Sequence, residues 1–217
     1  VFTDSDDFQI DMSSPDEAII GINDASTVGR WVLIAKINNT VGELRVIGGV
    51  SNFSKGLSVG GNLSDATNAE GYFKVSGGEI NFLDSFISVG QQGYGNMEVS
   101  GGICRADRGN IASGTAAQGD LSITGGLFEL TNHFDCGLRG TAAMDISAGE
   151  FAANTMFIGN TNTSSGSLVV SGTGNLNISE FMTIGRQGTG MLEVSGGTVN
   201  ADRSTVGQDA GSSGNVI

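Results

Sequence analysis

Apolar and polar residues alternate along most of this chain in short runs, and glycines separate the runs. In the segment GYFKVSGG, for example, Phe73 and Val75 fall on one side of an extended backbone and Lys74 falls on the other. This period of two is typical of β-strands that bury one face. The repeated segments lack the 3.6-residue period of an amphipathic helix, so the pattern predicts strands joined by glycine-containing turns.

The phrase G-x-L-x-V-x-G-G recurs at a nearly constant spacing. Copies begin at Gly42, Gly71, Gly95, Gly119, Ala142, Gly166 and Gly190, and a last one begins at Gly214. After a first step of 29 residues, successive copies lie 23 or 24 residues apart. A fixed period of this length indicates a solenoid, in which each repeat forms one coil that stacks on the next.

Each repeat contains three alternating runs, which predicts a triangular coil with one strand on each side. The predicted inward positions of the last two coils are Leu168/Val170, Leu176/Ile178, Met182/Ile184, Leu192/Val194, Val199/Ala201 and Ser204/Val206. Parallel stacking is expected to place Lys74 beside Glu98 and Arg105 beside Glu129 as exposed cross-strand ion pairs. The corner glycines are expected to supply positive φ angles or close backbone approach.

The predicted fold class is therefore all-β, a single parallel β-helix (β-solenoid) of triangular three-strand coils of about 24 residues, with roughly seven coils plus an N-terminal cap. Residues 1–38 lack the phrase, so we expect a divergent first coil or an N-terminal cap there, and solenoid repeats over residues 39–217. The copy at Gly214 stops in its first strand. We expect the native ladder to continue or to be completed end to end by another molecule.

The corner that follows the third strand varies in length in a regular way. From Gly90 onward, the step from the residue that closes this strand to the next copy alternates between 5 and 7 residues. The segment Ile87–Arg108 also closely matches Met182–Arg203, four coils later. These features predict a unit of two coils, about 48 residues, with wider corners on every second coil.

The acidic composition argues against nucleic acids and anionic membranes as binding partners. Ten Lys and Arg stand against 23 Asp and Glu, and the formal net charge of −13 repels phosphate backbones and anionic lipid headgroups. No stretch approaches the roughly 18 apolar residues of a membrane span. We therefore expect no nucleic-acid partner and no direct membrane insertion.

The repeated phrase, followed by a T-V-N-A-like strand and an I-x-V-G corner, resembles the repeats associated with type V secretion and PEP-CTERM exported bacterial proteins. Autotransporter passenger β-helices are similar in kind. The resemblance covers Val41–Ile217 and implies the solenoid architecture. It also implies an extracellular or bacterial cell-surface location and a role as a stalk or passenger.

Several residues could be taken for functional sites, but their positions in the repeat favour a structural interpretation. Cys104 and Cys136 fall in inward columns on different sides of the triangle, so we interpret them as buried core residues; a disulfide requires another register. The single histidine, His133, is expected to be a polar surface residue. The pairs Asp107–Arg108 and Asp202–Arg203 lie four coils apart, too far for one site, and are interpreted as repeated corner ion pairs.

Two further features are possible binding sites. The acidic run Asp4-Ser5-Asp6-Asp7 offers oxygen ligands for Ca²⁺, but a solvated N-terminal run is the preferred interpretation because calcium-binding β-roll repeats are absent. Trp31 and Phe157, an aromatic residue at an outward position, are candidates for stacking against a sugar, although one or two aromatic residues are also normal in a cap or a loop cover.

We expect a non-enzymatic exported structural protein, a rigid surface or filament-forming module of a bacterial extracellular assembly. No catalytic, cofactor-binding or metal-ligating residue and no cofactor is expected. The expected partners are further copies of the chain, joined end to end or laterally, or an extracellular matrix or polysaccharide. Two alternatives remain open. One is an adhesin or carbohydrate-binding passenger, and the other is a β-helix polysaccharide lyase or hydrolase, which requires clustered Asp, Lys or Arg on one face.

Overall fold

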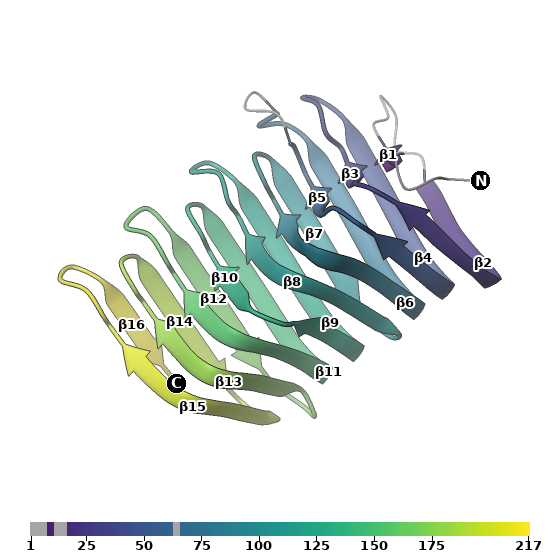
Figure 1. Cartoon of the computed structure of the whole chain (residues 1–217). Coiled ribbons are helices and arrows are strands. Elements are labelled where there is room, and N and C mark those ends of the chain that lie inside the picture. Colours follow the sequence, from purple (N-terminus) through teal and green to yellow (C-terminus); the bar gives the residue numbers. More distant parts are fainter. Residues whose placement is uncertain (1–7, 11–16, 63–65) are drawn as a thin grey trace.

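The described residues form sixteen strands, and Figure 1 shows them stacked from β1 and β2 at one end to β15 and β16 at the other. The computed structural model describes residues 8–10, 17–62 and 66–217, and these residues contain no helix. The strands are β1 (Phe8–Ile10), β2 (Glu17–Gly29), β3 (Val32–Ile34), β4 (Val41–Phe53), β5 (Leu57–Val59), β6 (Glu70–Val89), β7 (Tyr94–Val99), β8 (Ile103–Ile111), β9 (Gln118–Leu130), β10 (His133–Cys136), β11 (Thr141–Ile158), β12 (Ser165–Val170), β13 (Asn175–Ile184), β14 (Thr189–Val194), β15 (Thr198–Val206) and β16 (Ser213–Val216).

All pairings are parallel and join each strand to its equivalent one coil away. Three ladders result, one on each side of the coil, and they are called here the first, second and third ladder in the order in which the chain visits them after each repeat begins. Partners on the three ladders include Met97 and Leu121, Cys104 and Phe128, and Phe134 and Met156. The chain makes about eight turns with a spacing of about 24 residues. The predicted parallel β-solenoid is confirmed.

Long strands such as β6 pass through the corners without leaving the extended conformation. The ladder register of β6 shifts at two corners. Against β4 it shifts between Val46/Ile47 and Ile47/Val50 of β4, and against β8 it shifts between Phe82 and Phe86 of β6 itself. These irregularities coincide with the corners of the triangle. Bulges of this kind bend a strand and so let one strand serve two sides of the coil.

The inward columns are buried as the alternation predicts. Six inward residues of the coil that begins at Gly166 are at most 3% exposed: Leu168, Val170, Leu176, Ile178, Met182 and Ile184. One continuous apolar cluster runs from Ile10 to Leu192. The predicted inward positions of the last coil differ, because Val194 and Val206 are 39% and 50% exposed and Ser204 is also exposed. Beyond this coil the described chain adds only β16, whose register with β14 ends at Leu192 and Val216.

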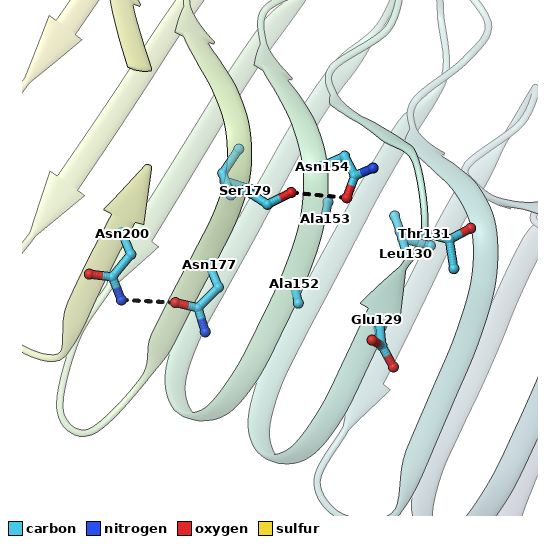
Figure 2. A pocket seen from close by; sticks show the side chains of 10 residues that line it. Glu129, Leu130, Thr131, Ala152, Ala153, Asn154, Asn177, Ser179 and Asn200 are labelled. Carbon is cyan, nitrogen blue, oxygen red and sulfur yellow. Dashed lines mark hydrogen bonds between the residues drawn. The ribbon is translucent and has the colours of Figure 1, made fainter. Parts of the chain in front are cut away.

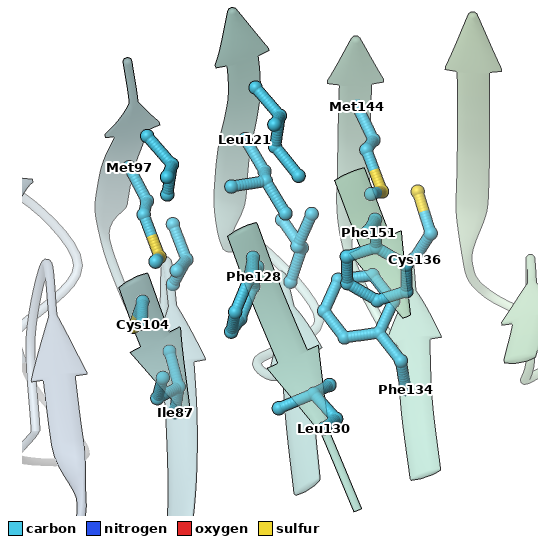
Figure 3. Close-up of a cluster of buried hydrophobic side chains, with 14 of the residues drawn as sticks. Ile87, Met97, Cys104, Leu121, Phe128, Leu130, Phe134, Cys136, Met144 and Phe151 are labelled. Carbon is cyan, nitrogen blue, oxygen red and sulfur yellow. The ribbon is translucent and has the colours of Figure 1, made fainter. Parts of the chain in front are cut away.

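Phenylalanines fill the middle of the stack, as Figure 3 shows. The ring centroid of Phe134 lies 4.8 Å from that of Phe151 and 6.3 Å from that of Phe128. Phe134 stacks directly on Gly109 in the third ladder, and a Cβ on Gly109 would lie 3.1 Å from the Phe134 ring. A large side chain thus occupies the space beside a residue that has none, which keeps the core densely packed.

Glycine pairs make the corner between the first and second ladders. The second glycine of the pair has a positive φ, 72° in Gly78 and 70° in Gly102, a conformation that residues with a Cβ rarely adopt. The first glycine passes close to the coil below, since a Cβ on Gly77 would lie 2.7 Å from the Ile47 carbonyl oxygen. Both expected reasons for glycine therefore apply here.

Corners between the third and first ladders alternate in length. Four residues separate β6 from β7, six separate β8 from β9, and the alternation continues to the last coil, with loops that protrude unequally in Figure 1. The short corners end in Gly93, Gly140 or Gly188, and each glycine lies against carbonyl oxygens of the preceding long corner. For Gly140 an added Cβ would lie 2.2 Å from the oxygen of Ala117. The predicted two-coil unit is confirmed in the alternating corners.

The first strands pair like the later rungs. β1 pairs with β3 in parallel, from Phe8 beside Val32 to Ile10 beside Ile34, and β2 pairs with β4 along both its halves. Within residues 8–10 and 17–38, the backbone thus extends the same ladders.

Outward ion pairs follow the predicted stacking only in part. The Arg105 guanidinium lies 2.8 Å from Glu129 as predicted, and it also lies 2.8 Å from Glu79 on the preceding coil. The predicted pair of Lys74 with Glu98 is wrong. The two residues are ladder neighbours, but the Lys74 ammonium reaches back to Glu43 at 3.0 Å.

Within the described ranges, no helix has the length and apolar character needed to span a membrane.

Candidate functional site

The two cysteines lie in the core, as predicted. Cys104 lies on β8 and Cys136 on β10, both are free, and neither is accessible to solvent. Burial raises the pKa of both thiols, and that of Cys136 reaches about 12. A thiol that keeps its proton is a poor nucleophile and a poor metal ligand, so these residues serve packing.

The predicted corner ion pairs are not formed. Neither Asp107 with Arg108 nor Asp202 with Arg203 is among the ion pairs of the described residues. Consecutive residues of an extended chain point to opposite sides, which separates the two charges of each pair. Asp107 instead accepts a hydrogen bond from the Thr131 hydroxyl on the next coil, at 3.1 Å.

His133, Asp135 and Thr155 form a row of three hydrogen-bonded side chains on the outer surface of the third ladder. Nε2 of His133 lies 2.9 Å from Oδ2 of Asp135, and Nδ1 of the same ring lies 2.9 Å from Oγ1 of Thr155. The imidazole is 28% exposed, so His133 is less open to solvent than a simple surface residue. Thr155 is the ladder neighbour of His133 on β11, and the parallel register alone brings the two together.

The Asp135 carboxylate, which binds His133 through one oxygen, is also hydrogen-bonded through its other oxygen. Asp135 is 6% exposed, and its Oδ1 accepts a hydrogen bond of 2.6 Å from the Asn160 side-chain amide. Arg186, one coil further, donates to Oδ1 of Asn160 at 3.0 Å. The corner residues Asn160 and Arg186 thus cover the outward residues of the preceding coil.

Of the two interpretations of Phe157, stacking against a sugar does not fit its position in the structure. Although Phe157 points outward, it is only 9% exposed, because the rings of His133 and Phe181 pack beside it and the Arg186 guanidinium lies 4.6 Å above it. Trp31 is partly buried and packs edge-on against Phe86, with ring centroids 5.5 Å apart. The Asp4-Ser5-Asp6-Asp7 run lies outside the described residues.

The carboxylate, imidazole and hydroxyl of Asp135, His133 and Thr155 stand in the order found in nucleophilic hydrolases. Such an enzyme also needs N–H donors aimed at the oxyanion. The backbone amides of Asn154 and Thr155 both donate to the carbonyl oxygen of Asn132, at 2.9 and 3.1 Å. Because these amides are already engaged, we interpret the three side chains as a hydrogen-bond network that orders the outer surface.

A concave strip on the second ladder offers more open polar groups, and Figure 2 shows it. We call this strip the amide groove. It is a hollow of about 500 Å³, lined by Glu129, Leu130, Thr131, Ala152, Ala153, Asn154, Asn177, Ile178, Ser179 and Asn200. The strip crosses four successive coils, from β9 through β11 and β13 to β15.

Side-chain amides are aligned along the groove by hydrogen bonds between coils. Asn200 donates to Oδ1 of Asn177 at 2.8 Å, and Asn177 donates to Glu150 at 2.7 Å. On the other side of the strip, Ser179 donates to Oδ1 of Asn154 at 3.0 Å. Ala152 interrupts the outward column between Glu129 and Asn177, and the missing side chain leaves the hollow.

A second, smaller hollow of about 430 Å³ lies at the other edge of the coil, lined by Asn39, Thr67, Asn68, Ala69, Glu70 and Tyr94. The Tyr94 hydroxyl donates to Asp120 at 2.7 Å, and burial together with this bond raises the pKa of Tyr94 to about 12. The phenol is therefore a neutral hydrogen-bond donor near neutral pH.

The sequence contained part of the signal for the amide groove. At the 24-residue period, the outward positions of the second strand include Glu129, Ala152, Asn177 and Asn200, so the polar column and its alanine interruption are visible. The concavity is not, because it depends on how the corner residues Asn154 and Ser179 stand beside that column.

Among the described residues, no group of three or more His, Cys, Asp or Glu side chains is placed to hold a metal ion. Comparisons of the chain with protein-family models, with curated proteins and with solved structures found no match.

Proposed function

We propose that this chain is a rigid structural module, a spacer or fibre-forming segment of a bacterial extracellular assembly. The observation that carries the proposal is the continuity of the scaffold. Among the described residues, three parallel ladders and an apolar cluster extend along the stack from Ile10 to Leu192.

Rigidity follows from the way in which each coil is held. Backbone amides and carbonyls pair with the coils on both sides, and about eight turns at ~4.8 Å per rung give a stack of roughly 38 Å. Side-chain bonds add to the backbone ladders, as where Arg105 joins Glu79 and Glu129 across three coils. Bending the stack requires many of these bonds to lengthen together.

The open ends of the ladders favour association with further copies of the same chain. In the described chain, β15 and β16 pair on one side only, and Val206 and Val216 are each 50% exposed there. Such an edge accepts another parallel strand, whether from the same polypeptide or from a second molecule. The extracellular setting is supported by the resemblance of the repeated phrase to repeats of exported bacterial proteins.

Electron microscopy of the native material, with an antibody to this segment, tests the proposal. We expect labelled filaments or stalks in which the segment occupies a straight rod. Dispersed compact particles would contradict it.

An activity assay provides the second test. The protein should release no reducing or unsaturated ends from neutral or acidic polysaccharides. Turnover that is lost on replacing His133 or Thr155 would overturn the structural proposal in favour of an enzyme.

A further inference from the structure

We propose that the amide groove binds a neutral oligosaccharide chain that lies along the axis of the stack. A rigid spacer needs no such site, so this inference goes beyond the structural role. The volume of about 500 Å³ falls in the range of roughly 300–1,000 Å³ that is usual for ligand sites. Four rungs at ~4.8 Å make the strip about 14 Å long, so the ligand is an extended oligomer rather than a single small molecule.

The groove presents donors and acceptors of the kind that pair with hydroxyl groups. Within the described residues, the inter-coil bonds use Oδ1 of Asn154 and Nδ2 of Asn200, and no protein atom engages Nδ2 of Asn154 or Oδ1 of Asn200. Each amide has two donors on nitrogen and two acceptor positions on oxygen. Because the other half of each amide is fixed by its neighbour, these groups are held in place before a ligand arrives.

Charge selects a neutral ligand over an anionic one. Among the described residues that line the groove, Glu129 is the one ionised side chain, and it is paired with Arg105 at 2.8 Å. No Lys or Arg is among these lining residues. The chain as a whole carries a formal charge of −13. Uronic acid and sulfated polymers would meet repulsion with no local compensation.

The shape of the groove favours a sugar chain over a peptide. Binding of an extended peptide by strand addition requires an open sheet edge. The groove crosses β9, β11, β13 and β15, and of these only β15 has an open edge in the described chain. A ligand along the axis of the stack lies across the strands and not alongside that edge. Apolar residues also line the hollow, but Leu130, Ala153 and Ile178 are each at most 4% exposed, so the outward Ala152 methyl group is the more open apolar surface. This small, shallow surface suits the flat C–H face of a pyranose ring better than a bulky side chain.

The test is titration of the folded protein with linear neutral oligosaccharides of four to six sugars. The panel contains cello-, manno-, xylo- and N-acetylchito-oligosaccharides, with oligogalacturonate and an extended polar peptide as comparators. Isothermal calorimetry measures the Kd, and NMR follows the side-chain amides of Asn154, Asn177 and Asn200. We expect at least one neutral oligosaccharide to shift these three amide signals.

Filling the hollow should remove binding. Ala152→Gln places an amide in the gap between Glu129 and Asn177, and we expect the Kd to rise at least about tenfold. Ala143→Gln is the matched control, because Ala143 lies on the same strand at an exposed outward position of the first ladder. This control should change the Kd less than about twofold. Circular dichroism confirms that both variants are folded.

Asn154→Ala supplies an independent readout that does not depend on filling the hollow. It removes one free donor, and the Kd should rise about fivefold, as expected for the loss of one hydrogen bond. The proposal is overturned if no neutral oligosaccharide shifts the three amides at millimolar concentration, if binding survives Ala152→Gln, or if only the peptide or the oligogalacturonate binds. None of these results would affect the structural role, which depends on imaging of the stack.

Discussion

Phe134 occupies the space that Gly109 leaves open in the third ladder, since a Cβ on Gly109 would lie 3.1 Å from Cδ2 of the ring. Neighbouring positions of the same column carry Ile87 and Met156, so the glycine is an exception that the phenylalanine compensates. The sizes of side chains on successive coils are therefore matched in pairs. A substitution in one rung should change the packing of the next rung.

The pair gives a double-mutant test. Gly109→Leu should destabilise the fold by about 1–3 kcal/mol, because the new side chain overlaps the Phe134 ring. In a Phe134→Leu background the same change should cost much less, since the ring is gone. Urea unfolding of the four proteins measures the coupling free energy, which we expect to exceed about 1 kcal/mol. Additive effects would show that the two residues do not share the space.

The short corners provide a second prediction. Gly140→Ala should lower the free energy of unfolding by about 2 kcal/mol, because the new Cβ meets the Ala117 and Gly114 carbonyl oxygens at 2.2 and 2.7 Å. Arg139→Ala in the same corner is the control. Arg139 is exposed, so its change should stay within about 0.5 kcal/mol. Equal thermal stability of the two variants would contradict the packing of short corner on long corner.

The buried thiols predict a loss of stability at alkaline pH. Burial raises the pKa of Cys136 from 9.0 to about 12 and shifts that of Cys104 in the same direction. Above pH 9 the unfolded chain releases thiol protons that the folded chain keeps, so the unfolded state binds fewer protons. The free energy of unfolding should then fall by up to about 1.4 kcal/mol per pH unit for each thiol.

Urea unfolding between pH 8 and pH 10 measures this slope. The double variant Cys104→Ala, Cys136→Ala should be less stable at pH 8 but show a flatter slope. In the same pH range, a thiol reagent should label the wild-type cysteines only when urea unfolds the protein. Rapid labelling of the folded protein would mean that the thiols are accessible.

Leu192 tests the inward column near the end of the described stack. It is 4% exposed and lies between Leu168 and Val216, so Leu192→Asp places a carboxylate in the core without a partner. We expect β14–β16 to lose protection in hydrogen exchange, while β7–β9 keep theirs, because coils contact only their neighbours. Glu193→Ala, the adjacent outward position, should leave the exchange pattern unchanged.

The repeated phrase predicted most of the fold. The alternation at Phe73, Lys74 and Val75 fixes which side chains face inward, and the 24-residue period aligns equivalent strands in parallel. Corner lengths were visible too, because a residue count needs no coordinates. The register also placed Arg105 beside Glu129 correctly.

Other features depended on the positions of long side chains and corners. Lys74 has two acidic neighbours within reach and pairs with Glu43 rather than Glu98, a choice that ladder register does not decide. The outward parity of Phe157 indicated exposure, yet Arg186 from a corner of the next coil covers its ring. Corners contain no alternation, so the sequence pattern gives no rule for where their side chains lie.

The sequence by itself determined the coil, its period, its inward columns and its alternating corners, because each depends on spacing along one chain. Only the tertiary structure decided which side chains meet on the outer surface of the coils. The chain of Asp135, His133 and Thr155 and the hollow at Ala152 arise where side chains of successive coils meet. Such contacts depend on distances across the stack, which a repeat of residue types does not specify.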